Sequence, residues 1–216
     1  MSQEPATDLE IQGARFQQAG ALAVLVLLVI ALNLAAAGMD ETAISKAAAA
    51  NCKLKIESLE AFAARPTPAG HQTTRFTQNE INSYLSLYLS AKYGPGLKTL
   101  FVTCEEDNRL QALAVLDFDR LGMNSSRLAI RLMADLFSGT HKLATRGALS
   151  SMGGKAYFQL EEARFDDNSL PGFLVEEIIT FVGRKQHPPF DPLKPSEMPY
   201  RIDRVEVHMG CIVVHQ

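Results

Sequence analysis

The longest uninterrupted hydrophobic stretch in the chain runs from Ala19 to Met39. It carries no charged residue, and Asn33 is its only polar side chain. An α-helix rises about 1.5 Å per residue, so roughly 20 residues cross the ~30 Å hydrocarbon core of a membrane. This stretch therefore predicts a transmembrane anchor at 19–39, between a short N-terminal tail at 1–18 and a much larger C-terminal part.

The residues around this stretch favour an anchor that is not cleaved. The tail contains Glu4, Asp8 and Glu10 against Arg15 alone, whereas a secretory signal peptide begins with basic residues. Small residues at 35–37 offer a cleavage pattern, but the apolar run before them is longer than the about 7–15 residues of a signal peptide. We therefore expect a signal anchor, with cleavage after Ala37 as the alternative.

The orientation of the anchor follows from the size of the two flanking parts. Lys46, Lys53 and Lys55 follow the span closely and only Arg15 precedes it closely, a distribution that favours a cytoplasmic domain. Long domains, however, cross the membrane largely regardless of that count. Because the tail is short and the domain is large, we expect a single-pass protein of the inner (cytoplasmic) membrane with an extracytoplasmic C-terminal domain.

An alanine-rich segment follows the predicted span. Residues 40–65 contain neither glycine nor proline and predict a helix. Its apolar residues form only a thin pattern, so we interpret the helix as a stalk. The sequence RPTPAG, from Arg65 to Gly70, interrupts it and marks a boundary. The helical stalk and linker are thus expected at 40–70 and the folded domain at 71–216.

The strongest local pattern begins a helix at Thr77. Thr77 and Glu80 form a capping-box pattern, and Phe76 is placed to pack on Ile81. The helix is expected to end near Lys92, before the sequence GPG. Its apolar residues cover more than one face, which indicates burial on more than one side. A core helix is one interpretation, and a wall of an apolar ligand cavity is the other.

The rest of the domain alternates hairpins with helices. Alternating apolar residues predict hairpins of 98–104 with 110–118, 140–149 with 155–165, and 201–208 with 211–216. Helices are expected at 124–139 and from Pro171 onward. This order predicts an α+β fold, with an antiparallel sheet of about six strands curled over the buried Thr77 helix.

Composition and motifs bear on function mainly by exclusion. The formal net charge of −3 and the lack of a dense Lys/Arg cluster argue against a nucleic-acid binder. The sequence has no P-loop, no GxGxxG, no GxSxG and no HExxH motif. We therefore expect no enzyme activity, no cofactor and no metal ion.

Two small sets of residues leave alternatives open. His208, Cys211 and His215 lie on one face of the last predicted hairpin, which would suit a Cys–His nucleophile. Ordinary positions near a chain end explain them as well. One possibility for the three cysteines, Cys52, Cys104 and Cys211, is a disulfide between Cys104 and Cys211. The other possibility is that all three are free, buried thiols.

Three segments resemble known envelope proteins. They are TQNEIN (77–82), GGKAYFQLEEARFDDNSLPGFL (153–174) and IDRVEVHMGCIVV (202–214). In these segments the chain resembles the YpmS-like and LmeA-like membrane-anchored bacterial envelope proteins, whose function is largely unknown. The resemblance implies a tubular lipid-binding type of fold with an apolar groove and a role in the cell envelope. It implies no catalytic residue.

The expected function is a membrane-anchored binding domain that holds a lipid or another apolar ligand. The ligand would lie between the Thr77 helix and the helix after Pro171, lined by Ile81, Tyr84, Leu85, Tyr88, Leu174, Ile178 and Phe181. One alternative is a protein-interaction module of an envelope complex with a filled core, and another is a hydrolase with an unrecognised site. An open apolar cavity favours the first function, a filled core with an exposed apolar patch the second, and polar groups that converge in a cleft the third.

Overall fold

The computed structural model describes residues 44–66, 70–90, 96–121, 138–166, 168–169, 171–184 and 191–216. The predicted transmembrane segment Ala19–Met39 and most of the helix predicted at 124–139 lie outside these residues. Among the helices of the described ranges, none is both long enough and apolar enough to span a membrane.

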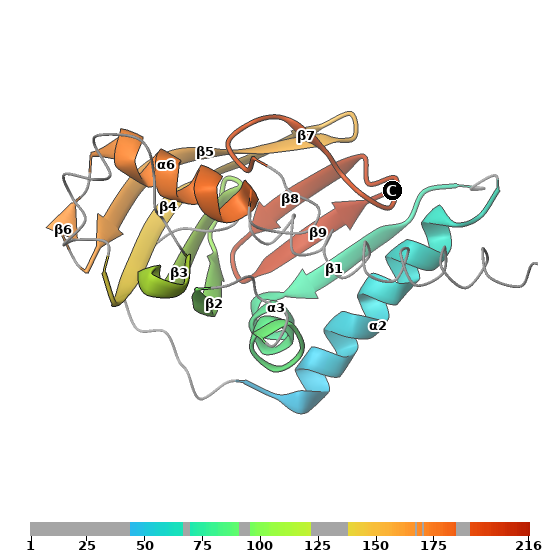
Figure 1. Ribbon diagram of the computed structural model, residues 1–216. Coiled ribbons are helices and arrows are strands. Elements are labelled where there is room, and N and C mark those ends of the chain that lie inside the picture. Colours follow the sequence, from blue (N-terminus) through green and yellow to red (C-terminus); the bar gives the residue numbers. More distant parts are fainter. Residues whose placement is uncertain are drawn as a thin grey trace, which may run out of the picture.

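The strands form two antiparallel sheets (Figure 1). The six-stranded sheet has the order β2-β3-β4-β5-β6, and β7 also pairs with β5. Its strands are β2 (Leu97–Cys104), β3 (Arg109–Asp117), β4 (Thr140–Met152), β5 (Lys155–Phe165), β6 (Asn168–Ser169) and β7 (Ser196–Glu197). The three-stranded sheet has the order β1-β9-β8, from β1 (Thr73–Thr77), β9 (Cys211–His215) and β8 (Arg204–His208). The predicted α+β class with an antiparallel sheet of about six strands is confirmed.

The last hairpin is the main difference from the predicted sheet. β8 and β9 pair as expected, but β9 also pairs with β1 along Thr73–Thr77. The sequence of β1, TTRFT, contains one apolar residue, Phe76, so it carries no alternating pattern that would reveal a strand. Because β9 pairs with β1 and β8, the hairpin belongs to a sheet separate from the six-stranded one.

Helix α2 (Lys46–Ala63) corrects the prediction of a stalk. It begins at Ser45, whose Oγ accepts a hydrogen bond from Ala48 N at 3.3 Å. One side of it is buried against α3 (Gln78–Tyr84), through Ala49, Cys52, Ile56, Leu59 and Phe62. Small Ala and Cys side chains at two of these positions hide the apolar stripe from a hydropathy pattern. The folded domain thus includes α2, so the predicted boundary at residue 70 is wrong.

Helix α3 begins as the capping pattern predicts. Thr77 Oγ1 accepts from Glu80 N at 3.2 Å, and Thr77 N donates to Glu80 Oε2 at 2.8 Å. The helix continues as a π-helical segment, η2 (Leu85–Leu89). π-Helical turns are rare and occur frequently at functional sites. Nothing in the hydrophobic pattern indicates this change of helix type.

Side chains of α3 cover the free edge of strand β2. Asn82 Oδ1 accepts from Val102 N at 2.7 Å, and Asn82 Nδ2 donates to Val102 O at 2.8 Å. Gln78 Oε1 accepts from Cys104 N at 2.8 Å. Buried backbone groups need partners, and an unpaired sheet edge is a pairing hazard. These two amide side chains therefore take the place of a neighbouring strand.

Side chains also join the two sheets. Ser151 Oγ donates to Val205 O at 2.7 Å and accepts from Val205 N at 2.9 Å. Asn108 Oδ1 accepts from Val207 N at 2.7 Å, and Asn108 has a φ of 57°, in the left-handed region that Asn tolerates. The backbone of β8 is thereby fixed to the ends of the larger sheet, and both sheets contribute to one core.

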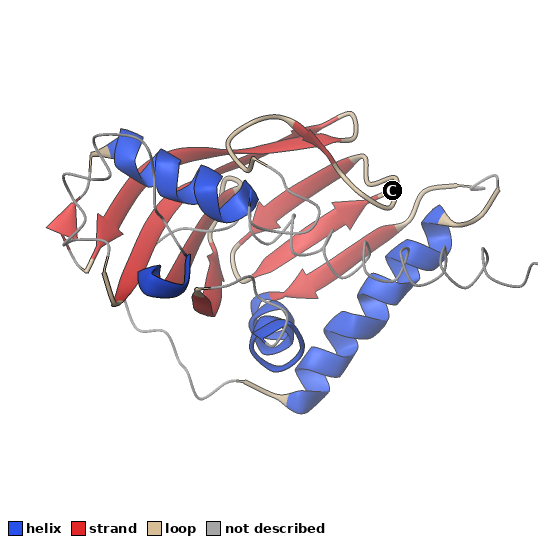
Figure 2. Cartoon of the chain, viewed as in Figure 1, coloured by secondary structure: helices blue, strands red, loops and turns tan. Residues whose placement is uncertain are grey.

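The remaining helices lie on different sides of the core (Figure 2). α6 (Gly172–Arg184) crosses the larger sheet and contacts β5, whereas α2 and α3 lie together at the smaller sheet. α4 (Phe118–Leu121) is a single turn after β3. On β4, a Cβ at Gly147 would come within 2.4 Å of Phe158 Cζ, so the packing of Phe158 requires glycine at that position.

Candidate functional site

The predicted ligand-lining residues of α3 and η2 are mostly buried. Ile81 is 2%, Tyr84 6% and Leu85 0% exposed, whereas Tyr88 is 41% exposed. The rings of Tyr84 and Tyr88 are stacked with centroids 5.5 Å apart. Burial raises the pKa of Tyr84 to about 12. The broad apolar surface is explained by packing on two sides, against α2 and against β2.

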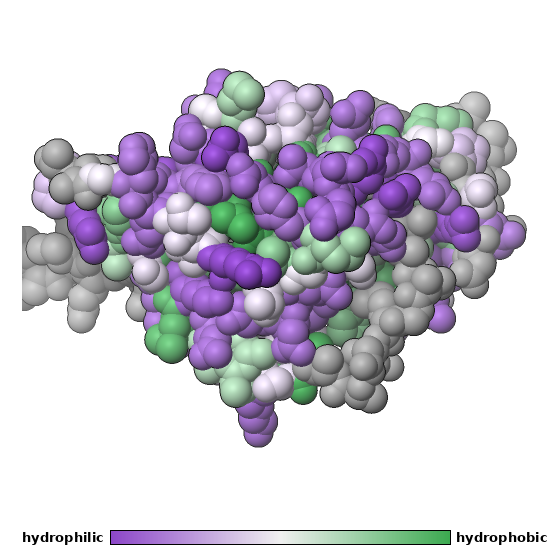
Figure 3. Space-filling view, turned by 180° about the vertical axis from the view of Figure 1, so that it is seen from behind, coloured by the Kyte–Doolittle hydropathy of each residue, from purple (hydrophilic) through white to green (hydrophobic). Residues whose placement is uncertain are grey.

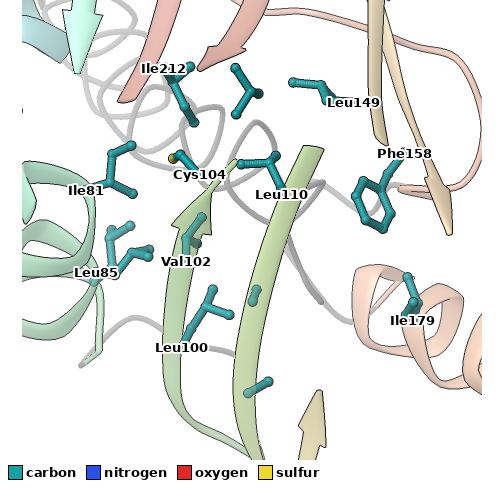
Figure 4. Close-up of a cluster of buried hydrophobic side chains, with 14 of the residues drawn as sticks. Ile81, Leu85, Leu100, Val102, Cys104, Leu110, Leu149, Phe158, Ile179 and Ile212 are labelled. Carbon is teal, nitrogen blue, oxygen red and sulfur yellow. The ribbon is translucent and has the colours of Figure 1, made fainter. Parts of the chain in front are cut away.

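The predicted lining residues of α6 lie elsewhere in the same core. Leu174 and Ile178 are buried, and Phe181 is partly buried against the core. In Figure 4, Leu85 lies on one side of strands β2 and β3 and Ile179 of α6 lies on the other. The labelled side chains of Leu100, Val102 and Leu110 lie between them. The structure therefore does not bring the two sets of residues together as facing walls.

The His208–Cys211–His215 set does not have the geometry of a Cys–His pair. Glu206 Oε2 lies 3.4 Å from His208 Nε2 and 3.5 Å from His215 Nε2, so both rings are directed at a carboxylate. Cys211 is 3% exposed, and no hydrogen bond between it and either ring is seen among the described residues. A nucleophilic cysteine needs an accessible thiolate beside a base, and this one is covered.

Electrostatics around Glu206 fit a surface ion cluster. Arg204 Nη2 lies 3.0 Å from Glu206 Oε1. Burial alone would raise the pKa of Glu206, but Arg204 and the two histidines outweigh it and hold this pKa below its ordinary value. The carboxylate thus remains charged and holds the Arg204 guanidinium beside it.

The three cysteines are free and buried. Burial raises the pKa of Cys52 and of Cys104 to about 12. A thiol with such a pKa carries little thiolate at neutral pH and reacts slowly. Of the two alternatives left open by the sequence, the structure shows free thiols.

A histidine that the sequence does not single out forms a close contact at the end of the large sheet. His141 Nδ1 lies 2.5 Å from Asp166 Oδ2, and its Nε2 lies 2.5 Å from Ser138 O. Burial lowers the pKa of His141, but these two bonds outweigh burial and raise the pKa above its ordinary value. Both ring nitrogens are engaged, so His141 joins chain segments and is not placed to act as a base.

A pocket of about 370 Å³ lies beside the turn between β4 and β5. It is formed by Gly153 and Gly154, by Lys155 and Glu197 of the paired strands, and by residues of the segment 198–203. The predicted hairpin of 140–149 with 155–165 places the two glycines in its turn and gives no sign of a pocket. The other wall follows a proline-rich segment that offers no periodic pattern, so no sequence signal places it opposite the turn.

Comparison with known proteins gives no family for this chain. No protein-family model matches it, and no curated protein matches it at a significant level. The resemblance of the segments 77–82, 153–174 and 202–214 to envelope proteins therefore stays a prediction.

Proposed function

We propose that this chain is a membrane-anchored, extracytoplasmic binding domain that meets a partner of an envelope complex at its surface and catalyses no reaction. The membrane anchor rests on the apolar stretch Ala19–Met39. The absence of catalysis rests on the covered Cys211 and on histidines that contact Glu206. Each of these points supports the proposal independently of the others.

The filled interior is the main observation in favour of a partner that binds at the surface of the domain. Leu85 and Val102 are both 0% exposed, and side chains of β2 and β3 occupy the space between Leu85 and α6 (Figure 4). A ligand between the predicted walls would have to displace these side chains. Since protein cores are close-packed, opening an internal ligand site would require much more free energy than binding a partner at an existing surface.

Leu87 and Tyr88 on η2 provide the contact surface that we propose. They are 46% and 41% exposed, they are consecutive, and they lie on a π-helical segment. Exposed aromatic residues are enriched at protein interfaces, and π-helical turns occur frequently at functional sites. The face of the molecule that is seen from behind the view of Figure 1 is mostly hydrophilic, with hydrophobic residues in small separate groups (Figure 3).

Photo-crosslinking in intact cells tests this surface. A photoreactive amino acid in place of Tyr88 should give a discrete adduct of higher mass. The same residue in place of Leu54, which is 63% exposed on α2, should give none. An adduct at both positions, or at neither, would contradict a specific contact at η2.

A lipid or other apolar ligand remains a second proposal, and the Tyr84–Tyr88 stack favours it. This ring pair leads from a buried position to an exposed one, as at the mouth of an apolar site. Native mass spectrometry of the detergent-purified full chain separates the two functions. The surface-partner proposal predicts the mass of the chain alone, and a lipid retained at one per chain would establish the apolar-ligand function instead.

A further inference from the structure

The pocket beside the β4–β5 turn has a firmly held backbone. Gly154 N donates to Asp203 O at 3.0 Å, and Gly154 O accepts from Met198 N at 2.7 Å. Lys155 and Glu197 are paired residues of neighbouring strands. Gly154 has a φ of +77°, which favours glycine. One turn residue thus ties the two walls together, and the pocket is formed before any ligand binds.

Two residues with strained backbone lie in the segment that forms one wall of the pocket, and one of them, Arg201, lines it. Tyr200 and Arg201 have φ values of 56° and 54°, in a region that non-glycine residues rarely adopt. The ring of Tyr200 packs on the core, and Tyr200 O accepts from Gln216 Nε2 at 2.5 Å. This anchoring directs the backbone so that Arg201 lines the pocket. Strained backbone that is held by its surroundings is frequent at ligand sites.

The pocket combines an apolar floor with charges of both signs. Met198 and Ile202 are buried. Lys155 and Arg201 supply two cations, and Glu197 and Asp203 supply two anions. None of these four side chains forms an ion pair with another residue of the described ranges. Arg201 donates a hydrogen bond to Arg65 O at 3.1 Å. Charges of both signs are therefore available to a ligand.

We propose that this pocket binds a small amphoteric ligand, which carries one ammonium group and one carboxylate or phosphate group a few atoms away. The volume of about 370 Å³ lies within the roughly 300–1,000 Å³ of small-molecule sites. The cations contact the anionic group, the anions contact the ammonium group, and the carbon chain lies on Met198 and Ile202. The ligand is either a free metabolite or the head group of a zwitterionic lipid. This site is separate from the proposed partner surface at Leu87 and Tyr88.

Isothermal titration calorimetry of the full chain in a non-ionic detergent tests the site, with O-phosphoethanolamine as the probe. Binding should saturate, and inorganic phosphate or ethylamine alone should bind at least about tenfold more weakly, because each engages half of the charges. Lys155→Gln and Glu197→Gln should each weaken binding by about tenfold or more. Lys194→Gln is the matched control, since Lys194 is exposed and pairs with Asp191 at 3.3 Å outside the pocket, and it should change nothing.

Two further results decide the proposal and the source of the ligand. No saturable binding up to about 10 mM, or equal binding of inorganic phosphate, would overturn it. If the amides of Gly153 and Gly154 shift in nanodiscs of phosphatidylethanolamine but not of phosphatidylglycerol, the ligand is a lipid head group. If they shift only when free O-phosphoethanolamine is added, the ligand is a soluble molecule.

Discussion

Helix α3 with its continuation η2, and helix α6, both place apolar residues in the core, but they are held in different ways. α3 is fixed to β2 by the amide groups of Gln78 and Asn82, and Glu80 joins it to α2 through Lys55 at 2.7 Å. α6 places Leu174, Val175, Ile178 and Ile179 in the core, and Thr180 Oγ1 lies 3.4 Å from Asp191 Oδ1 at its edge. The polar residues of α3 therefore support the fold.

The largest expected effect comes from a charge in the buried face of α3 and η2. Leu85→Asp should unfold the domain, because an unpaired buried charge costs several kcal/mol. The whole free energy of unfolding of a domain of this size is only roughly 5–15 kcal/mol. Leu87→Asp, two residues further along, should change the free energy of unfolding by less than about 1 kcal/mol. Urea denaturation of the two variants makes the comparison. A Leu85→Asp protein as stable as wild type would show that this helix lies at the periphery.

The next effect contrasts the polar contacts of the two helices. Asn82→Leu should lower the free energy of unfolding by about 2–4 kcal/mol, since it leaves the buried N–H and C=O groups of Val102 without partners. Thr180→Val on α6 removes a longer bond at the helix edge and should cost less than about 1 kcal/mol. Equal losses in thermal or urea denaturation would remove the distinction between α3 and α6.

The smallest effect concerns the Lys55–Glu80 pair and depends on pH. Burial raises the pKa of Glu80, but Lys55 and the Thr77 amide outweigh burial and hold it below its ordinary value of 4.5. A carboxylate whose pKa is lowered by folding stabilises the folded state above its unfolded pKa, and that stabilisation is lost as the pH falls through the folded pKa. Glu80→Gln should therefore cost about 1–2 kcal/mol at pH 7, and the difference from wild type should vanish in acid.

An exposed pair on α2 provides the control for this pH dependence. Lys53 Nζ lies 3.4 Å from Glu57 Oε1, and both side chains are about half exposed. Glu57→Gln should change the free energy of unfolding by less than about 0.5 kcal/mol at every pH, because exposed ion pairs contribute little. If Glu80→Gln behaves in the same way, the buried pair gives α3 no special support.

The parts of the fold that were predictable are those with strong local signals. The capping box at Thr77 and Glu80 and the three hairpins need only neighbouring residues, so they follow from the sequence. Strand β1 and the packing of α2 depend on distant partners, β9 and α3, and their own sequences carry weak patterns. The apolar stripe of α2 includes the small residues Ala49 and Cys52, so its sequence alone suggests an exposed stalk. The packing of α2 against α3 shows that this stripe is buried.

The candidate site was less predictable for the same reason. Buried residues such as Ile81 and Leu85 are correctly identified as apolar and internal, but hydropathy does not tell which side chains fill the space beside them. The pocket is formed by the Gly153–Gly154 turn and the segment 198–203, which are far apart in the sequence. The β5–β7 pairing and the hydrogen bonds of Gly154 with Met198 and Asp203 bring them together.

Amide hydrogen exchange at Val102 and Cys104 tests most directly whether α3 serves as the neighbour of strand β2. In the wild-type chain both amides should be protected as well as those of the β3–β4 ladder, although β2 pairs with no strand of the described ranges on that side. Asn82→Ala should remove the protection of Val102 while the β3–β4 ladder keeps its own. Rapid exchange of Val102 in the wild-type chain, or unchanged protection in the variant, would contradict this account.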